Sequence, residues 1–215
     1  MNEIRRHCEA VLEKLNQNGI TGAYAATAAE ARSAVAALLH PGDTIGLGGS
    51  ETLKHCGLLD VARRPEYRLF DRYAAQSPDE MRRCLADSLT ADVFLSGCNA
   101  ITESGELYNV DGRGNRVAPI TYGAGRVILV AGYNKIVPDL AAAVERVRTV
   151  AAPRNAQRLN KQTACARTGK CVACGQPMGA GCASPDRICR TFVVTGAQGT
   201  PGRIHIILVG EALGY

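Results

Sequence analysis

The chain has 215 residues, of which 46% are hydrophobic and 21% charged, and these proportions are typical of a globular protein with one main domain. Its net charge of +5 is spread along the chain, tryptophan is absent and aromatic residues make up 5%, so we expect no nucleic-acid partner. No apolar stretch reaches the roughly 18 residues that span a bilayer, and the start does not read as a signal peptide. We therefore expect a cytoplasmic protein with no membrane partner, in which disulfides are rare.

Apolar spacing predicts helices and strands that alternate along the chain. The predicted helices cover residues 2–17, 28–39, 77–89 and 139–150, and one more begins near Ser50. The predicted strands cover residues 22–27, 43–47, 67–70, 91–96, 126–131, 191–195 and 203–210. Because several strands are apolar on both faces, the pattern predicts an α/β fold with a mostly parallel sheet and helices on each side.

We expect a single domain, 1–215, with three parts. Residues 1–152 form the α/β core, residues 153–190 form a cysteine-rich segment, and residues 191–215 form the C-terminal strands, of which the last is expected to pair with the sheet. The composition changes near Pro153, where polar residues lead into the cysteines.

A glycine-rich turn follows the predicted strand at 43–47. Ligands of parallel α/β sheets bind beyond the carboxyl ends of strands, where backbone N–H groups and hydroxyls can hold an anion. The candidate substrate-binding residues of this turn are Gly46, Gly48, Gly49, Ser50 and Thr52. The turn lacks the dinucleotide fingerprint and the P-loop lysine, so a plain tight turn is the alternative.

Polar residues also follow two other predicted strands. Past residue 96 the candidates are Asn99, Glu103, Asn109 and Asp111, and past residue 131 the candidate anion partner is Lys135. Glu103 is the candidate acid or base, because partial burial at a sheet edge raises the pKa of a carboxylate. The alternative is that these side chains only cap turns.

Several segments together resemble one family along most of the chain. These are GLGGSETL, LFDRYAA, LTADVFLSGCNAITESGELYNVDGRGNRVA, VAGYNKIVPDL, AAPRNAQRLN, SPDRIC and ILVGEALGY. Together they are similar to the lactate-utilisation (LUD) domain family, in particular to its lactate-utilisation protein C-like members. The resemblance implies a three-layer sandwich like those of glucosamine-6-phosphate deaminase, ribose-5-phosphate isomerase and CoA transferases.

The resemblance also bears on function. In that superfamily the turn that matches Gly46 to Thr52 binds phosphate or acyl-carrying substrates. At the position of Asn99, the sugar-phosphate isomerase and initiation-factor 2B branch has a catalytic aspartate. An amide cannot take up a proton, which leaves Glu103 as the better carboxylate candidate, with Asn99 beside it. The family name implies a role in oxidising lactate to pyruvate, alongside iron–sulfur oxidoreductase subunits as partners.

Five of the nine cysteines lie between residues 165 and 189, with the spacing C-x5-C-x2-C-x7-C-x6-C. Thiolates are ligands of zinc and of iron–sulfur clusters. The expected ligands are Cys165, Cys171, Cys174 and Cys189, with Cys182 as the alternative to Cys174. An iron–sulfur cluster of the 4Fe–4S type is favoured on the redox associations of the family, and zinc is the alternative. A redox-active thiol pair and unligated structural thiols are the other interpretations.

Three functions remain open on the sequence. The first is an enzyme or enzyme subunit that acts on a small carboxylate or phosphorylated anion, with a cofactor bound by the cysteines. The second is a non-catalytic partner subunit of an iron–sulfur lactate oxidase, and the third is a thiol redox sensor. A homo-oligomer is expected from the habit of this fold.

Overall fold

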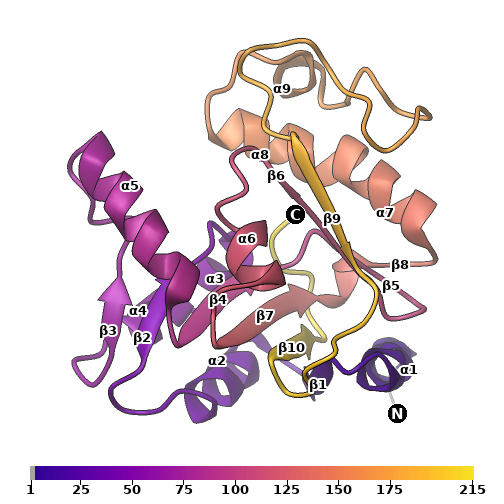
Figure 1. Ribbon diagram of the computed structural model, residues 1–215. Helices are drawn as coiled ribbons and strands as arrows, with labels where there is room; N and C mark the ends of the chain where they lie inside the picture. Colours follow the sequence, from indigo (N-terminus) through magenta and orange to yellow (C-terminus); the bar gives the residue numbers. More distant parts are fainter. Residues whose placement is uncertain (1–2) are drawn as a thin grey trace.

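The computed structural model describes residues 3–215, and its centre is a six-stranded parallel sheet (Figure 1). The strands, in spatial order, are β1 (Thr21–Ala25), β10 (Ile204–Val209), β7 (Arg126–Gly132), β4 (Val93–Gly97), β2 (Thr44–Leu47) and β3 (Arg68–Phe70). The last strand of the chain, β10, lies between β1 and β7, with Ile207 paired to Ala23 and to Val130. The predicted return of the last strand of the chain to the sheet is therefore confirmed.

Helices cover both faces of this sheet. On one face, α2 (Ala28–Ala37), α3 (Glu51–His55) and α4 (Leu58–Ala62) bury one apolar cluster against the strands. On the other face lie α1 (Glu3–Gln17) and α6 (Val117–Thr121), and α5 (Pro78–Asp87) follows β3. Four apolar side chains of α1 recur at helical spacing and are buried, namely Cys8, Val11, Leu12 and Leu15. Among residues 3–215, none of the helices combines the length and apolar character needed to cross a membrane.

A second, four-stranded sheet lies beside the first. It consists of β8 (Ile136–Val137), β5 (Ala100–Thr102), β6 (Leu107–Asp111) and β9 (Thr191–Thr195), in that spatial order. The hairpin β5–β6 was not predicted, because its polar residues suggested a turn. Its alternating side chains instead face two cores. Leu107 packs toward the main sheet, and Tyr108 packs toward the helical run of residues 140–158.

A long helical run covers the outer face of the second sheet. It starts with α7 (Leu140–Arg146), continues through a π-helical turn (Val147–Ala151) and ends with α8 (Ala152–Arg158). Pro153 cannot donate a backbone hydrogen bond and its ring crowds the preceding turn, which accounts for the π-helical turn just before it. The expected boundary at residue 152 therefore falls inside continuous helix. The α/β fold with a mostly parallel sheet is confirmed.

Candidate functional site

A cleft of about 780 Å³ opens at the carboxyl ends of β2, β4 and β7. Its lining is far more basic than acidic. The basic residues are Arg72, Arg113, Arg116, Lys135, Arg158, Lys161, Arg187 and Arg190, and the acidic ones are Glu51, Asp111 and Asp186. Such a concave basic surface attracts small anions.

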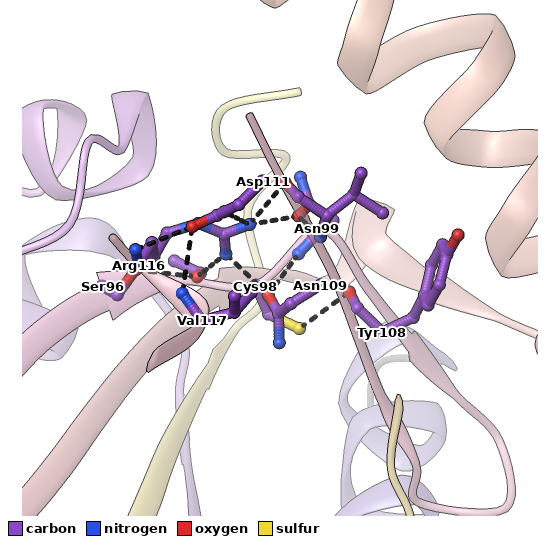
Figure 2. Close-up of polar contacts among 10 residues, drawn as sticks. Ser96, Cys98, Asn99, Tyr108, Asn109, Asp111, Arg116 and Val117 are labelled. Carbon is purple, nitrogen blue, oxygen red and sulfur yellow. Dashed lines mark hydrogen bonds and ion pairs between the residues drawn. The ribbon is translucent and has the colours of Figure 1, made fainter. Parts of the chain in front are cut away.

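Arg116 is the centre of a buried polar network (Figure 2). Its Nε donates to Asp111 (3.0 Å), its Nη1 to Asn109 (2.6 Å) and to the carbonyl of residue 97 (3.1 Å). Its Nη2 donates to Asn99 (2.5 Å) and to the carbonyl of residue 110 (3.0 Å). A guanidinium has five N–H donors, so all of them are used within the chain.

Asp111 and Asn109 both belong to the hydrogen-bond network of Arg116. Asp111 also accepts the backbone N–H groups of Arg116 (2.7 Å) and Val117 (3.0 Å), and thereby fixes the start of α6. Asn109 is fully buried and does not line the cleft. Its amide nitrogen has no hydrogen-bond partner within residues 3–215, but rotating the amide would turn this NH2 toward the Arg116 cation. Asn109 and Asp111 therefore hold Arg116 in place.

Lys135 differs from Arg116 in how its donors are used. It follows β7 in a short 3-10 turn (Tyr133–Lys135), and its side chain is buried in the floor of the cleft. Its ammonium donates to the Thr52 hydroxyl (2.8 Å), which in turn donates to the Leu213 carbonyl (3.4 Å). The ammonium has three N–H donors, and within residues 3–215 Thr52 is the single acceptor for them. Burial lowers the pKa of Lys135 to about 8, with Arg146 and Arg116 adding to the effect.

The glycine turn divides into residues that pack and residues that face the cleft. Gly49, Ser50 and Thr52 line the cleft, and the Ser50 hydroxyl also caps α3 by accepting from the Leu53 N–H (3.3 Å). Gly46 and Gly48 do not line it. A Cβ at Gly46 would lie 2.8 Å from the Cβ of Ser88, and a Cβ at Gly48 would lie 2.9 Å from the Cβ of Ser96. Glycine at these two positions permits the close approach of Ser88 to β2 and of Ser96 in β4 to the turn.

The structure does not bring the two catalytic candidates together. Asn99 lines the cleft, with its side-chain oxygen between Arg116 and the backbone N–H of Val110 (2.9 Å). Glu103 lies at the tip of the β5–β6 hairpin, half exposed, with an oxygen 3.0 Å from Nε2 of His7 in α1. Glu103 does not line the cleft, so its position does not support a role as the acid or base of the cleft.

The thiols near the cleft are poorly suited to nucleophilic attack. Cys98 lines the cleft, Cys56 interacts electrostatically with Lys135 in its floor, and both are buried. Burial raises the pKa of the Cys98 thiol, and it raises that of Cys56 to about 11. Since the thiolate is the nucleophilic form, both groups are in the unreactive state near neutral pH.

Four of the five clustered cysteines surround a second, small cavity. Cys165, Cys171, Cys182 and Cys189 line a mostly apolar space of about 20 Å³, whereas Cys174 does not. All of these thiols are free. Within residues 3–215 no three His, Cys, Asp or Glu side chains already stand at metal-ligand spacing. The donor types nevertheless fit a soft metal, and Cys189 also lines the large cleft.

Together these features define an α/β protein with a basic cleft at the carboxyl ends of a parallel sheet, the usual position of ligand sites in such folds. The chain belongs to the LUD domain family, whose family model matches residues 8–209. This confirms the resemblance seen in the sequence motifs. A search of curated proteins finds no match.

A solved structure agrees with this assignment at the level of fold. A DUF162 family protein from Deinococcus radiodurans is 18% identical and superimposes with a TM-score of 0.54 over 98% of this chain and 100% of its own. Lower similarity is found to eIF2B delta from Chaetomium thermophilum, with 18% identity and a TM-score of 0.35 over 51% of this chain and 47% of that one. A Pseudomonas malonate decarboxylase hetero-tetramer in complex with malonate is 15% identical, with a TM-score of 0.33 over 64% of this chain and 34% of that one.

Proposed function

We propose that the chain binds a small carboxylate or phosphorylated anion in the basic cleft, as an enzyme or enzyme subunit of lactate-utilisation metabolism. Lactate oxidation to pyruvate is the reaction to which this role would belong. Membership of the LUD domain family supports a metabolic role of this type. The observation that carries the proposal is the buried Lys135 ammonium, whose remaining donors have no acceptor within residues 3–215.

The other cations of the cleft support the same ligand class. Within residues 3–215 neither Arg72 nor Arg113 forms a salt bridge, so both guanidinium groups are free to meet a carboxylate or phosphate. Arg–oxyanion hydrogen bonds are charge-assisted and often bidentate. Because the pKa of Lys135 is about 8, its ammonium can also give up a proton to a bound substrate at near-neutral pH.

A cofactor held by the cysteines is the second part of the proposal. An iron–sulfur cluster would supply one-electron transfer and is favoured on the family's redox associations, whereas zinc would be structural. The apolar lining and the four thiols around one cavity support a thiolate-bound group. The cavity of about 20 Å³ has room for one water-sized sphere, so a cluster would require the cysteine segment to move outward.

A non-catalytic partner subunit is the second candidate function. It is favoured by the position of Glu103 outside the cleft and by the protonated state of Cys98, which leave the floor without an obvious general base or nucleophile. A thiol redox sensor is the third candidate, and it draws support from the free state of the clustered thiols.

Calorimetric titration of the full chain with lactate, pyruvate and inorganic phosphate tests the proposal. We expect at least one of these anions to bind, and Lys135→Met to weaken binding at least tenfold. Lys14→Met, which removes the same charge from the exposed face of α1, is the control and should change affinity less than twofold. Equal affinities of the wild type and Lys135→Met would contradict the proposal. Turnover of lactate with an artificial electron acceptor separates the enzyme from the partner subunit.

A further inference from the structure

The cysteine cavity and the basic cleft share a wall. Residues 185–190, the end of the cysteine-rich segment just before β9, line the cleft. Cys189, which is one of them, lines both the cleft and the small cavity. Cys165 reaches the small cavity from α9 (Ala164–Thr168), and Cys171 and Cys182 reach it from the loop that follows. Whatever fixes Cys189 therefore also fixes part of the cleft.

Residues 185–190 carry two of the cations of the cleft, and they are bonded to one another. Arg187 donates from Nε to the carbonyl of Cys189 (2.7 Å), and Arg190 donates to the carbonyls of Arg187 (2.9 Å) and Pro185 (2.6 Å). The N–H of Arg190 also bonds to the carbonyl of Asp111 (2.8 Å), the residue that holds Arg116. A displacement of Cys189 would therefore move both arginines.

The surroundings of the small cavity suit a negatively charged metal–thiolate group. Tyr108, Val147 and Phe192 give it an apolar lining, and Arg148 places a buried guanidinium at its edge. Arg148 donates to the carbonyls of Gln176 (2.5 Å) and of the next residue (2.6 Å), so it also holds the loop in shape. Four thiolates around one divalent ion have a net charge of −2, which a buried cation offsets.

Cys174 is separated from this set. It does not line the cavity, and its thiol lies beside the carboxylate of Glu145 instead. Glu145 itself accepts the N–H of residue 175 (2.9 Å) and pairs with Arg148 (3.1 Å). Cys174 therefore lies outside the group of four thiols that surround the cavity.

We propose that Cys165, Cys171, Cys182 and Cys189 are the ligands of a soft metal centre, with Cys174 as the spare. We further infer that loading this centre raises the affinity of the cleft for its anion, because it fixes the wall that carries Arg187 and Arg190. On loading, the four thiols release their protons to solvent as the metal–sulfur bonds form, and no oxidation is involved. By linkage, a bound anion tightens metal binding by the same factor. The coupling rests on the proposed anion-binding function.

The ligand assignment is tested by metal content. The full chain and its variants are purified anaerobically, and zinc, iron and absorbance near 400 nm are measured. We expect the wild type and Cys174→Ser to hold a stoichiometric centre and Cys182→Ser to lose at least nine-tenths of it. Stoichiometric zinc identifies a single ion, whereas iron with the absorbance band identifies a cluster. Retention by Cys182→Ser together with loss by Cys174→Ser would overturn the assignment.

A measurement on the wild type covers the case in which Cys182→Ser fails to fold. The loaded and chelator-treated proteins are alkylated without denaturation, and the modified peptides are identified by mass spectrometry. Metal should protect Cys182 and leave Cys174 reactive. Protection of Cys174 with reaction at Cys182 would overturn the assignment.

The coupling is tested by titrating pyruvate or inorganic phosphate into the loaded and metal-free wild type. We expect metal removal to weaken binding at least fivefold, and the double variant Arg187→Ala/Arg190→Ala to abolish this difference. Equal affinity of the loaded and metal-free forms would refute the coupling alone. Absence of anion binding in the fully loaded protein would refute the proposed function instead.

Discussion

Replacing Lys135 by methionine should stabilise the fold while it removes anion binding. Burial lowers the pKa of Lys135 from the usual 10.5 to about 8. At about 1.4 kcal/mol per pH unit, this interval of about 2.5 units corresponds to ~3 kcal/mol by which the cation destabilises the folded state. Loss of the hydrogen bond to Thr52 removes about 1 kcal/mol of stabilisation. The substitution is therefore expected to raise the free energy of unfolding by about 2 kcal/mol at pH 7.

The stability difference between Lys135→Met and the wild type should decrease as the pH rises. Below pH 8 both the folded and the unfolded wild type hold the proton, and the destabilisation is fully present. Between pH 8 and 10.5 the unfolded chain binds more protons, so the stability of the wild type rises with pH. The advantage of Lys135→Met should therefore shrink to within about 0.5 kcal/mol of zero at pH 9.5. Of the thiols near Lys135, Cys98 has a pKa raised by burial, and Cys56, with a pKa of about 11, stays protonated in this window.

Urea unfolding at pH 7 and at pH 9.5 measures these differences. Lys14→Met, at an exposed position of α1, is the matched control and should show no pH-dependent change relative to the wild type. The reasoning is refuted if Lys135→Met is less stable than the wild type at pH 7. It is equally refuted if the gain is the same at both pH values, because the destabilisation would then have a source other than the buried charge.

Four further substitutions separate the contribution of packing from the contribution to anion binding. Asp111→Asn leaves the buried Arg116 cation without its counter-charge, and urea unfolding should show a loss of about 3–5 kcal/mol. Glu103→Gln lies outside the cleft, so titration with the anion that the wild type binds should show less than a twofold change in affinity. Gly48→Ala forces a Cβ against Ser96 and should cost about 1–3 kcal/mol. Gly49→Ala, whose Cβ would lie 3.6 Å from Nη1 of Arg72, should be nearly neutral in the same unfolding measurement.

The parallel sheet could be predicted because its strands are apolar on both faces, a pattern that polar loops interrupt clearly. The run VILV in β7 and the run FL in β4 are fully buried, as expected. The second sheet could not be predicted, because polar residues lie within its strands. Asn109 and Asp111 are residues typical of turns, and their bonds to Arg116, in the loop that follows β6, help to hold them inside a strand.

The candidate site was predicted in part for a similar reason. Rules about strand ends placed Ser50, Thr52, Asn99 and Lys135 at one edge of the sheet, and the structure brings all of them to the cleft. Arg116 was missed, because an arginine in a glycine-rich loop carries no local signal of burial. The same rules misplaced Glu103, since they could not show that it lies at the far end of a hairpin.

Whether a buried cation supports the fold or binds a ligand depends on how many of its donors are already used. Arg116 directs all five N–H groups at acceptors of the chain, so an incoming anion would have to break bonds already formed. Lys135 is equally buried and nearby, but Thr52 accepts one of its three donors, and its lowered pKa shows that the chain does not compensate the charge. An uncompensated cation in a protein interior is destabilising unless an anion from outside the chain neutralises it. Neutralisation by the proposed anion would explain why a lysine lies in the floor of this cleft.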